Sequence, residues 1–163
     1  MKFATWNMAY WTHKETNSEA WNYFTQSLGC DILLFQEGNP DLKILDENRL
    51  VWHPIGDTRP WGSGIYSIKN KIKEHSFKSD FFGAVVASEV SIKKDFKIIV
   101  ISLYGLFETI SGCIYSIPNL HRIFSDLTGI LESRYTSKRI IIGGDFNASL
   151  QWDKKNNNHI HRV

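Results

Sequence analysis

The chain has 163 residues, which suits one domain with a single substantial core. Its composition, with 42% hydrophobic, 22% charged and 13% aromatic residues, is typical of a folded protein and excludes intrinsic disorder over most of the length. The formal charge of +2 is too small to indicate a strong phosphate-steering field or a preference for acidic partners.

The N-terminal segment has no apolar core or cleavage site of the kind that marks a secretion signal. No apolar run approaches the roughly 18 to 20 residues that span a bilayer, so no transmembrane segment is expected. The two cysteines, Cys30 and Cys113, show neither metal-ligand nor redox spacing. We therefore expect a reduced, cytoplasmic protein.

The first quarter of the chain has the pattern of a strand, a helix and a second strand. Residues 2–8 predict a strand, and residues 31–37 predict a buried strand whose apolar run stops at a carboxylate. Between them, Asn17 or Ser18 is expected to cap a helix that ends at Gly29. The apolar residues of this helix recur at helical spacing: Ala20, Trp21, Phe24 and Leu28. This order predicts a β-α-β opening.

The middle of the chain changes to short strands divided by polar or Gly/Pro turns, which is typical of an antiparallel meander. The strands are predicted at residues 50–55, 64–68, 71–77, 84–92 and 96–103. A helix is expected to begin at Ser116, with Pro118 near its start, where the missing N–H has no cost. Its expected apolar face comprises Ile117, Leu120, Phe124, Leu127 and Leu131. The last strand is predicted at residues 139–142, and no internal repeat or linker divides the chain.

Three short segments place acidic or amide side chains where a strand-like apolar run ends. They are Thr-Trp-Asn at residues 5–7, Phe-Gln-Glu at residues 35–37 and Gly-Gly-Asp-Phe-Asn at residues 143–147. Oxygen ligands fixed at several strand ends suit a hard cation such as Mg²⁺, which takes carboxylates, amides and water. The pattern therefore predicts metal-assisted phosphate chemistry.

Together with the strand that ends in Ser-Leu-Tyr at residues 102–104, these segments resemble the endonuclease/exonuclease/phosphatase superfamily in order and spacing. The resemblance covers residues 2 to about 152 and implies an α+β fold, the four-layer α/β sandwich of the deoxyribonuclease-I-like type. Members include abasic-site and deoxyribonuclease-I-like nucleases, sphingomyelinases and inositol-polyphosphate phosphatases. The resemblance therefore implies a divalent-metal-dependent hydrolase of phosphate esters, with nucleic acid as one candidate substrate and no information on oligomeric state.

The resemblance also implies a role for each matching residue. Glu37 would ligate Mg²⁺, with Mn²⁺ as the alternative ion, and Asn7 would lie beside it, in contact through the phosphate or a bridging water. Asp145 would orient or deprotonate the attacking water, and Asn147 would donate to the scissile phosphate and fix Asp145. Tyr104 would donate to a phosphate oxygen. A cation and preorganised donors lower the barrier to phosphoryl transfer, because negative charge collects on the phosphate oxygens.

The chain departs from the family pattern after Asn147. The family continues with another Asp and a C-terminal Ser-Asp-His, whereas Asp153 follows too soon to be that Asp. We therefore expect an N-terminal fragment: a partial domain over residues 1–152, which lacks the C-terminal part of the second sheet, and a polar tail over residues 153–163. His159 and His161 would share one face of a strand and form an alternative catalytic or metal pair. Tail histidines without a nearby carboxylate are more often solvated.

Alternative interpretations remain open for the same residues. Taken singly, Asn7 and Glu37 also fit strand-end caps, Asp145 fits a turn residue and Tyr104 fits a core aromatic. The site hypothesis therefore depends on the set. The alternative functions are a truncated, non-catalytic remnant and an interaction module of the same fold.

Other polar and aromatic residues carry weaker signals. Arg59 and Trp61 are candidates for substrate contact, since they lie on a turn-rich loop. The lysines at positions 69, 71, 73, 93 and 94 fit solvated strand faces, because no aromatic residues interleave with them as in a nucleic-acid groove. The isolated histidines at positions 13, 53, 75 and 121 fit surface or packing sites.

Overall fold

The computed structural model describes residues 1–94, 96–110, 113–114, 116–132 and 139–148. The elements in these ranges are β1 (Phe3–Asn7), η1 (Lys14–Thr16), α1 (Asn17–Gln26), β2 (Ile32–Gly38), η2 (Glu47–Arg49), β3 (Leu50–Pro54), β4 (Gly62–Ser67), β5 (Ile72–Glu74), β6 (Val85–Lys93), β7 (Phe96–Tyr104), β8 (Thr109–Ile110), β9 (Cys113–Ile114), α2 (Ser116–Leu131) and β10 (Arg139–Asp145). Within them, no helix has the length and apolar character needed to cross a membrane.

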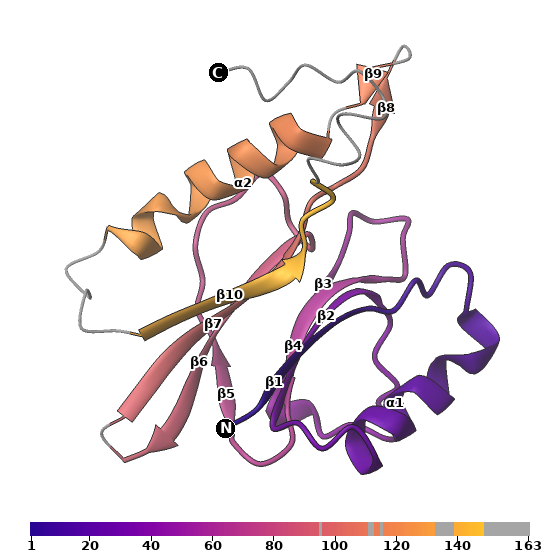
Figure 1. The fold of residues 1–163 in the computed structure, drawn as a ribbon, viewed down its shortest axis with the longest axis vertical. Coiled ribbons are helices and arrows are strands. Elements are labelled where there is room, and N and C mark those ends of the chain that lie inside the picture. The colour runs from indigo at the N-terminus through magenta and orange to yellow at the C-terminus, as the bar shows by residue number, and fades with distance from the viewer. Residues whose placement is uncertain (95, 111–112, 115, 133–138, 149–163) are drawn as a thin grey trace.

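The strands form two four-stranded sheets and a small hairpin of β8 and β9 (Figure 1). The first sheet has the order β1-β2-β4-β3, and the second has the order β10-β7-β6-β5. β1 and β2 pair in parallel with α1 between them, which confirms the β-α-β opening. The second sheet also contains a parallel pair, β10 with β7. Each sheet therefore brings the carboxyl ends of two neighbouring strands together.

The predicted single meander is wrong, because its strands divide between the two sheets. β3 and β4 pair antiparallel in the first sheet, whereas β5, β6 and β7 form an antiparallel run in the second. β4 has β2 on one edge and β3 on the other, so β5 does not pair with β4 and instead pairs with β6 in the second sheet. Alternating apolar residues indicate burial of one strand face, but they do not specify the neighbouring strand.

Four layers of secondary structure enclose three apolar layers. α1 covers the outer face of the first sheet through a cluster that includes Trp21, Phe24, Leu33, Phe35 and Tyr66. The two sheets pack face to face through Ile32, Leu34, Ile65, Val86, Val90, Ile98 and Val100. α2 covers the outer face of the second sheet (Figure 1). This order of layers confirms the expected α+β sandwich of the deoxyribonuclease-I-like type.

The start of α1 differs from the sequence prediction. Thr16 is the N-cap, and neither Asn17 nor Ser18 caps the helix. The side chain of Asn17 instead donates to the carbonyl oxygen of Asn39 at 2.9 Å, and that of Ser18 donates to Asp41 at 2.6 Å. These polar side chains tie the helix to the loop after β2, so a contact distant in sequence replaces the local cap.

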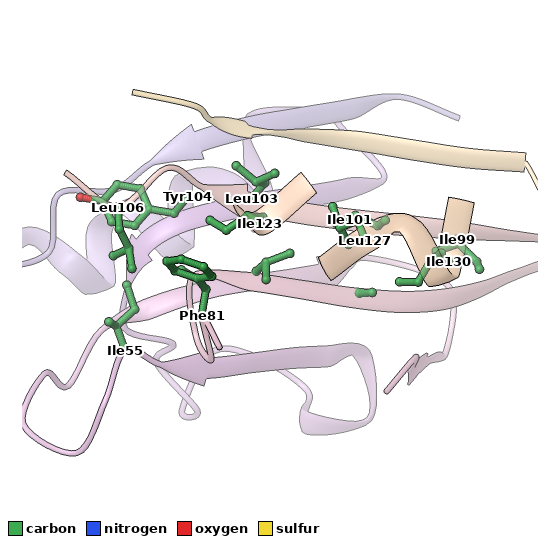
Figure 2. Packing of buried hydrophobic residues seen from close by; sticks show 13 residues of the cluster. Ile55, Phe81, Ile99, Ile101, Leu103, Tyr104, Leu106, Ile123, Leu127 and Ile130 are labelled. Carbon is green, nitrogen blue, oxygen red and sulfur yellow. The ribbon is translucent and has the colours of Figure 1, made fainter. Parts of the chain in front are cut away.

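The apolar face predicted for α2 is only partly right. Ile123, Leu127 and Ile130 are buried against β7 and its neighbours, as Figure 2 shows. Phe124 and Leu131, which were expected in that face, are 36% and 40% exposed. The helix is rotated relative to the predicted face, since its burial follows the stripe through Ile123 and Ile130. The side chain of Ile117 lies outside those that the structure describes.

Candidate active site

The predicted site residues lie at the carboxyl ends of four strands, two from each sheet. Asn7 is the last residue of β1, Glu37 is next to last in β2, and Tyr104 and Asp145 end β7 and β10. In the parallel registers Asn7 lies opposite Gln36, and Asp145 lies opposite Tyr104. Because both parallel pairs end on the same side of the sandwich, side chains that are far apart in sequence meet there.

Asn7 joins the two acidic residues of the site. Its Nδ2 donates to Glu37 Oε1 at 3.1 Å and to Asp145 Oδ2 at 2.8 Å. Its Oδ1 accepts from the backbone N–H of Ala9 at 2.9 Å, which fixes the orientation of the amide. The amide nitrogen therefore faces both carboxylates and offsets part of their mutual repulsion.

Glu37 is a nearly buried carboxylate, 7% exposed, that several donors surround. Besides Asn7, the hydroxyl of Tyr104 is hydrogen-bonded to it, and the indole Nε1 of Trp11 donates to its Oε2. Burial, followed by the hydrogen bond to Glu37 and the negative charges of Glu37 and Asp145, raises the pKa of Tyr104 well above its usual value. Tyr104 is therefore a neutral hydrogen-bond donor throughout the physiological pH range.

Asn147 fixes Asp145 through its backbone. The N–H of Asn147 donates to Asp145 Oδ1 at 3.0 Å, and the side-chain Nδ2 of Asn147 donates to the carbonyl oxygen of Gly105 at 2.8 Å. The second N–H of that amide is chemically able to donate elsewhere. The two oxygens of Asp145 thus have separate partners, Asn7 and Asn147, which set the plane of the carboxylate.

The last strand is longer than the predicted residues 139–142, because β10 continues through Gly143 and Gly144 to Asp145. Gly144 has a φ of +154°, which L side chains rarely adopt. A Cβ atom placed there would lie 1.8 Å from the carbonyl oxygen of Leu103. Glycine is therefore needed for β10 to stay paired with β7 up to Asp145.

The described non-glycine residues with positive φ all lie at this site. They are Ala9, Glu37 and Asn147, with φ values of 43°, 48° and 47°. Glu37 falls where the register between β2 and β4 shifts, between Phe35 and Gly38. Such backbone costs about 1–3 kcal/mol per residue and tends to collect at functional sites. In this conformation the Glu37 side chain accepts a hydrogen bond from Asn7 Nδ2.

A buried network of hydrogen bonds joins three of the strands that carry the site residues. Gln36 is fully buried, and its Nε2 donates to Ser102 Oγ at 2.9 Å, while Ser102 Oγ donates to the carbonyl oxygen of Phe35 at 3.0 Å. Thr5 Oγ1 donates to Gln36 Oε1 at 3.3 Å. These bonds join β1 and β2 of the first sheet to β7 of the second, so they fix the spacing of the strand ends that carry the site.

The loop of Arg59 and Trp61, between β3 and β4, reaches the same place. The ring of Trp61 meets that of Tyr104 edge to face at a centroid distance of 6.3 Å, and Arg59 Cζ lies 5.3 Å from the Trp61 ring centroid. The positive charge of Arg59 acts on Tyr104 and partly opposes the rise in its pKa. The loop is thus adjacent to the site, and its contact with substrate stays a prediction.

The donor set fits a hard divalent cation. Glu37 and Asp145 approach the same amide, and Mg²⁺ in proteins is usually held by one or two carboxylates while it keeps several waters. No group of three or more His, Cys, Asp or Glu side chains suited to a metal occurs in the part of the chain that the structure describes. Asp153, His159 and His161 lie outside the described residues.

Trp11 is the site residue that sequence reasoning missed. It lies in the loop after β1, outside the three motifs, and its contact with Glu37 links positions 26 residues apart. The available signal was an aromatic residue four positions after Asn7 in a segment with no apolar periodicity. That signal alone does not distinguish a site residue from a packing residue.

The four layers form the deoxyribonuclease-I-like fold, and the predicted site residues lie at its strand ends. Two solved structures with this fold are similar to the chain. The endonuclease domain of TRAS1, a telomere-specific non-LTR retrotransposon, matches with a TM-score of 0.62 and 18% identity over 93% of this chain. A humanized TDP2 of D. rerio, carrying 14 mutations, matches with a TM-score of 0.59 and 14% identity over 96% of this chain.

The chain spans 62% of the length of the TRAS1 domain and 70% of the TDP2 chain. No protein-family model matches the sequence, and no curated protein matches it either. The likeness to the two solved structures is therefore one of fold alone, at 18% and 14% sequence identity.

Proposed function

We propose that the chain is a divalent-metal-dependent hydrolase of phosphate esters. The observation that carries the proposal is the Asn7 amide, which holds Glu37 and Asp145 together across the two sheets. Two carboxylates this close repel each other, and a cation between or beside them relieves that repulsion while it attracts a phosphate. Both neighbours share the fold, and one of them is an endonuclease domain, which supports a phosphodiester as substrate.

In this proposal each residue acts at a defined atom. Mg²⁺, or Mn²⁺ in its place, would be held by Glu37 and would stabilise negative charge on the phosphate oxygens. Asp145 orients a water molecule and accepts its proton as the water oxygen bonds to phosphorus. The bond from phosphorus to the leaving oxygen breaks, and that oxygen takes a proton from solvent.

The remaining side chains position the reacting groups. Asn147 holds Asp145 through its backbone N–H, and its free side-chain N–H is proposed to donate to the scissile phosphate. Tyr104 keeps its proton, so it would donate to a phosphate oxygen once its single O–H turns from Glu37 to the substrate. Asn7 would contact the cation through the phosphate or a bridging water, while its Oδ1 accepts a hydrogen bond from the backbone N–H of Ala9.

The test is hydrolysis of bis(p-nitrophenyl) phosphate by the 163-residue chain, with Mg²⁺, with Mn²⁺ and with EDTA. We expect release of p-nitrophenol that EDTA removes and that Glu37→Gln and Asp145→Asn each reduce. The matched control is Glu15→Gln, which neutralises an exposed glutamate in η1. EDTA-resistant turnover, or full turnover in Glu37→Gln, would contradict the proposal.

A second candidate is a domain of the same fold that binds a cation without turning substrate over. We retain this candidate because the chain spans 62% and 70% of the length of the two neighbours. Cation binding that Glu37→Gln abolishes, combined with no hydrolysis of the diester or of single- and double-stranded DNA, would support this candidate over the enzyme.

A further inference from the structure

Trp11 is an exposed residue that contacts a nearly buried carboxylate. Its side chain is 64% exposed, yet its indole N–H donates to the nearly buried carboxylate of Glu37. The loop that carries it is fixed close to Glu37, because the N–H of Tyr10 donates to the carbonyl oxygen of Glu37 at 2.9 Å. The N–H groups of Thr12 and His13 both donate to Ala9, at 2.9 Å and 3.1 Å, and close a turn around Trp11.

The three donors to Glu37 differ in how firmly they are held. Asn7 is also bonded to Asp145 and to Ala9, and Tyr104 is 6% exposed with its ring against Trp61. An indole has a single N–H, so Trp11 is attached to the site by one hydrogen bond, and most of its ring faces solvent. It is therefore the donor that can leave with the least loss of packing.

The hydrogen bond from Trp11 occupies an oxygen that a cation would need. A carboxylate has about four lone-pair sites, and the three donors take most of them. A buried carboxylate is costly without a partner, so a donor at Oε2 stabilises Glu37 when no cation is bound. The same donor competes with a cation for that oxygen.

We propose that Trp11 is a displaceable donor, which holds Glu37 Oε2 in the absence of a divalent cation and is released from it when the cation binds. The inference rests on the proposed function, since it takes Glu37 as the cation ligand. Trp11 thus lowers the affinity of the site for the cation and reports its occupancy through the environment of the indole.

The experiment compares the wild-type chain with Trp11→Phe, which keeps an aromatic ring and removes the N–H. Mg²⁺ affinity is measured by titration calorimetry, and tryptophan fluorescence is recorded during the same titration. We expect Trp11→Phe to bind Mg²⁺ about three- to tenfold more tightly, because the competing hydrogen bond is absent. The wild-type spectrum should change saturably with Mg²⁺, and this change should be missing in Trp11→Phe.

Trp52→Phe serves as the matched control, since Trp52 lies on β3 in the cluster under α1 and the chain has six tryptophans. It should retain both the wild-type affinity and the fluorescence change. Weaker Mg²⁺ binding in Trp11→Phe would overturn the proposal, because Trp11 would then support the cation. Equal affinity without a change in Trp11 fluorescence would also overturn it, and would leave the cation site intact if Glu37→Gln abolishes binding. Absence of Mg²⁺ binding in all variants would overturn both this inference and the proposed function.

Discussion

Asn7 and Asp145 are separated by 138 positions in the sequence, yet Asn7 Nδ2 donates to Asp145 Oδ2 at 2.8 Å. This bond joins the end of β1 in the first sheet to the end of β10 in the second. The same nitrogen donates to Glu37, so one amide sets the separation of both carboxylates. The face-to-face packing of the sheets is thereby coupled to the chemistry proposed at their common end.

Asn7→Ala should damage both stability and turnover. The change leaves Glu37 and Asp145 without the donor between them, and the loss of a partner for a buried group costs about 1–3 kcal/mol in the free energy of unfolding. Loss of an outer partner of a metal-binding carboxylate typically lowers metal affinity or activity by about 10- to 100-fold. Urea unfolding and diester hydrolysis measure the two effects. Asn22→Ala, on the exposed face of α1, is the control: it should leave turnover unchanged and should not lower the unfolding free energy, because alanine is favoured in a helix.

Glu37→Gln and Asp145→Asn should separate cation binding from chemistry. Glu37→Gln removes the proposed ligand charge, so Mg²⁺ binding measured by calorimetry should fall by about 10²-fold or more, and turnover should fall with it. Asp145→Asn should leave binding largely intact and slow turnover by about 10²- to 10⁴-fold, the usual contribution of a general base. If both variants lose binding equally, Asp145 is a ligand and the division of roles is wrong.

The strand ends that carry the site could be predicted from the sequence, because an amide or a carboxylate stands where each apolar run ends. Asn7, Glu37 and Asp145 each follow such a run, and the Asn7 amide donates to both carboxylates. The roles assigned to them stay predictions. The order of the layers was predicted from the resemblance to the endonuclease/exonuclease/phosphatase superfamily, and the structure confirms that order.

The features that sequence reasoning missed all depend on contacts between distant segments. The contact of Trp11 with Glu37 requires the loop after β1 to fold back over β2. Phe124 lies outside the buried stripe of α2, and its ring stacks on that of Phe146 at 6.1 Å between centroids. Helical spacing alone places Phe124 in the buried face, because it does not include the segment after β10.

Tyr104 should keep its proton to a higher pH in the folded chain than in the unfolded chain, since its pKa is raised. Below the unfolded pKa of about 10, both states are protonated and Tyr104 adds no pH dependence. Above it, the unfolded chain releases the proton first, so the free energy of unfolding should decrease as the pH rises. Tyr104→Phe should make that decrease less steep in urea unfolding at a series of alkaline pH values.

The near-ultraviolet absorbance of tyrosinate provides a direct check on Tyr104. Subtracting the titration of Tyr104→Phe from that of the wild type isolates this residue, and its ionisation should begin well above pH about 10. Tyr23→Phe removes a tyrosine that is 51% exposed and controls for the loss of one ring. Ionisation of Tyr104 at or below pH about 10 would contradict both its burial and its hydrogen bond to Glu37.

Gly144→Ala should destabilise the fold more than any other single methyl addition near the site. The φ of +154° is unfavourable for alanine, and the new Cβ would lie 1.8 Å from the carbonyl oxygen of Leu103, which is backbone and cannot rotate away. We expect a loss of about 2–4 kcal/mol in the free energy of unfolding. Separation of β10 from β7 would also displace Asp145 from Asn7, so diester hydrolysis should fall even where the chain remains folded.

Gly129→Ala is the matched control for this prediction. Gly129 lies in α2, and a Cβ atom there meets nothing within 4 Å. Alanine is favoured over glycine in a helix by about 0.5–1 kcal/mol, so Gly129→Ala should raise the unfolding free energy slightly. Urea unfolding of the two variants under identical conditions should therefore give shifts of opposite sign. A Gly144→Ala chain as stable as the wild type would mean that β10 does not pair with β7 up to Asp145.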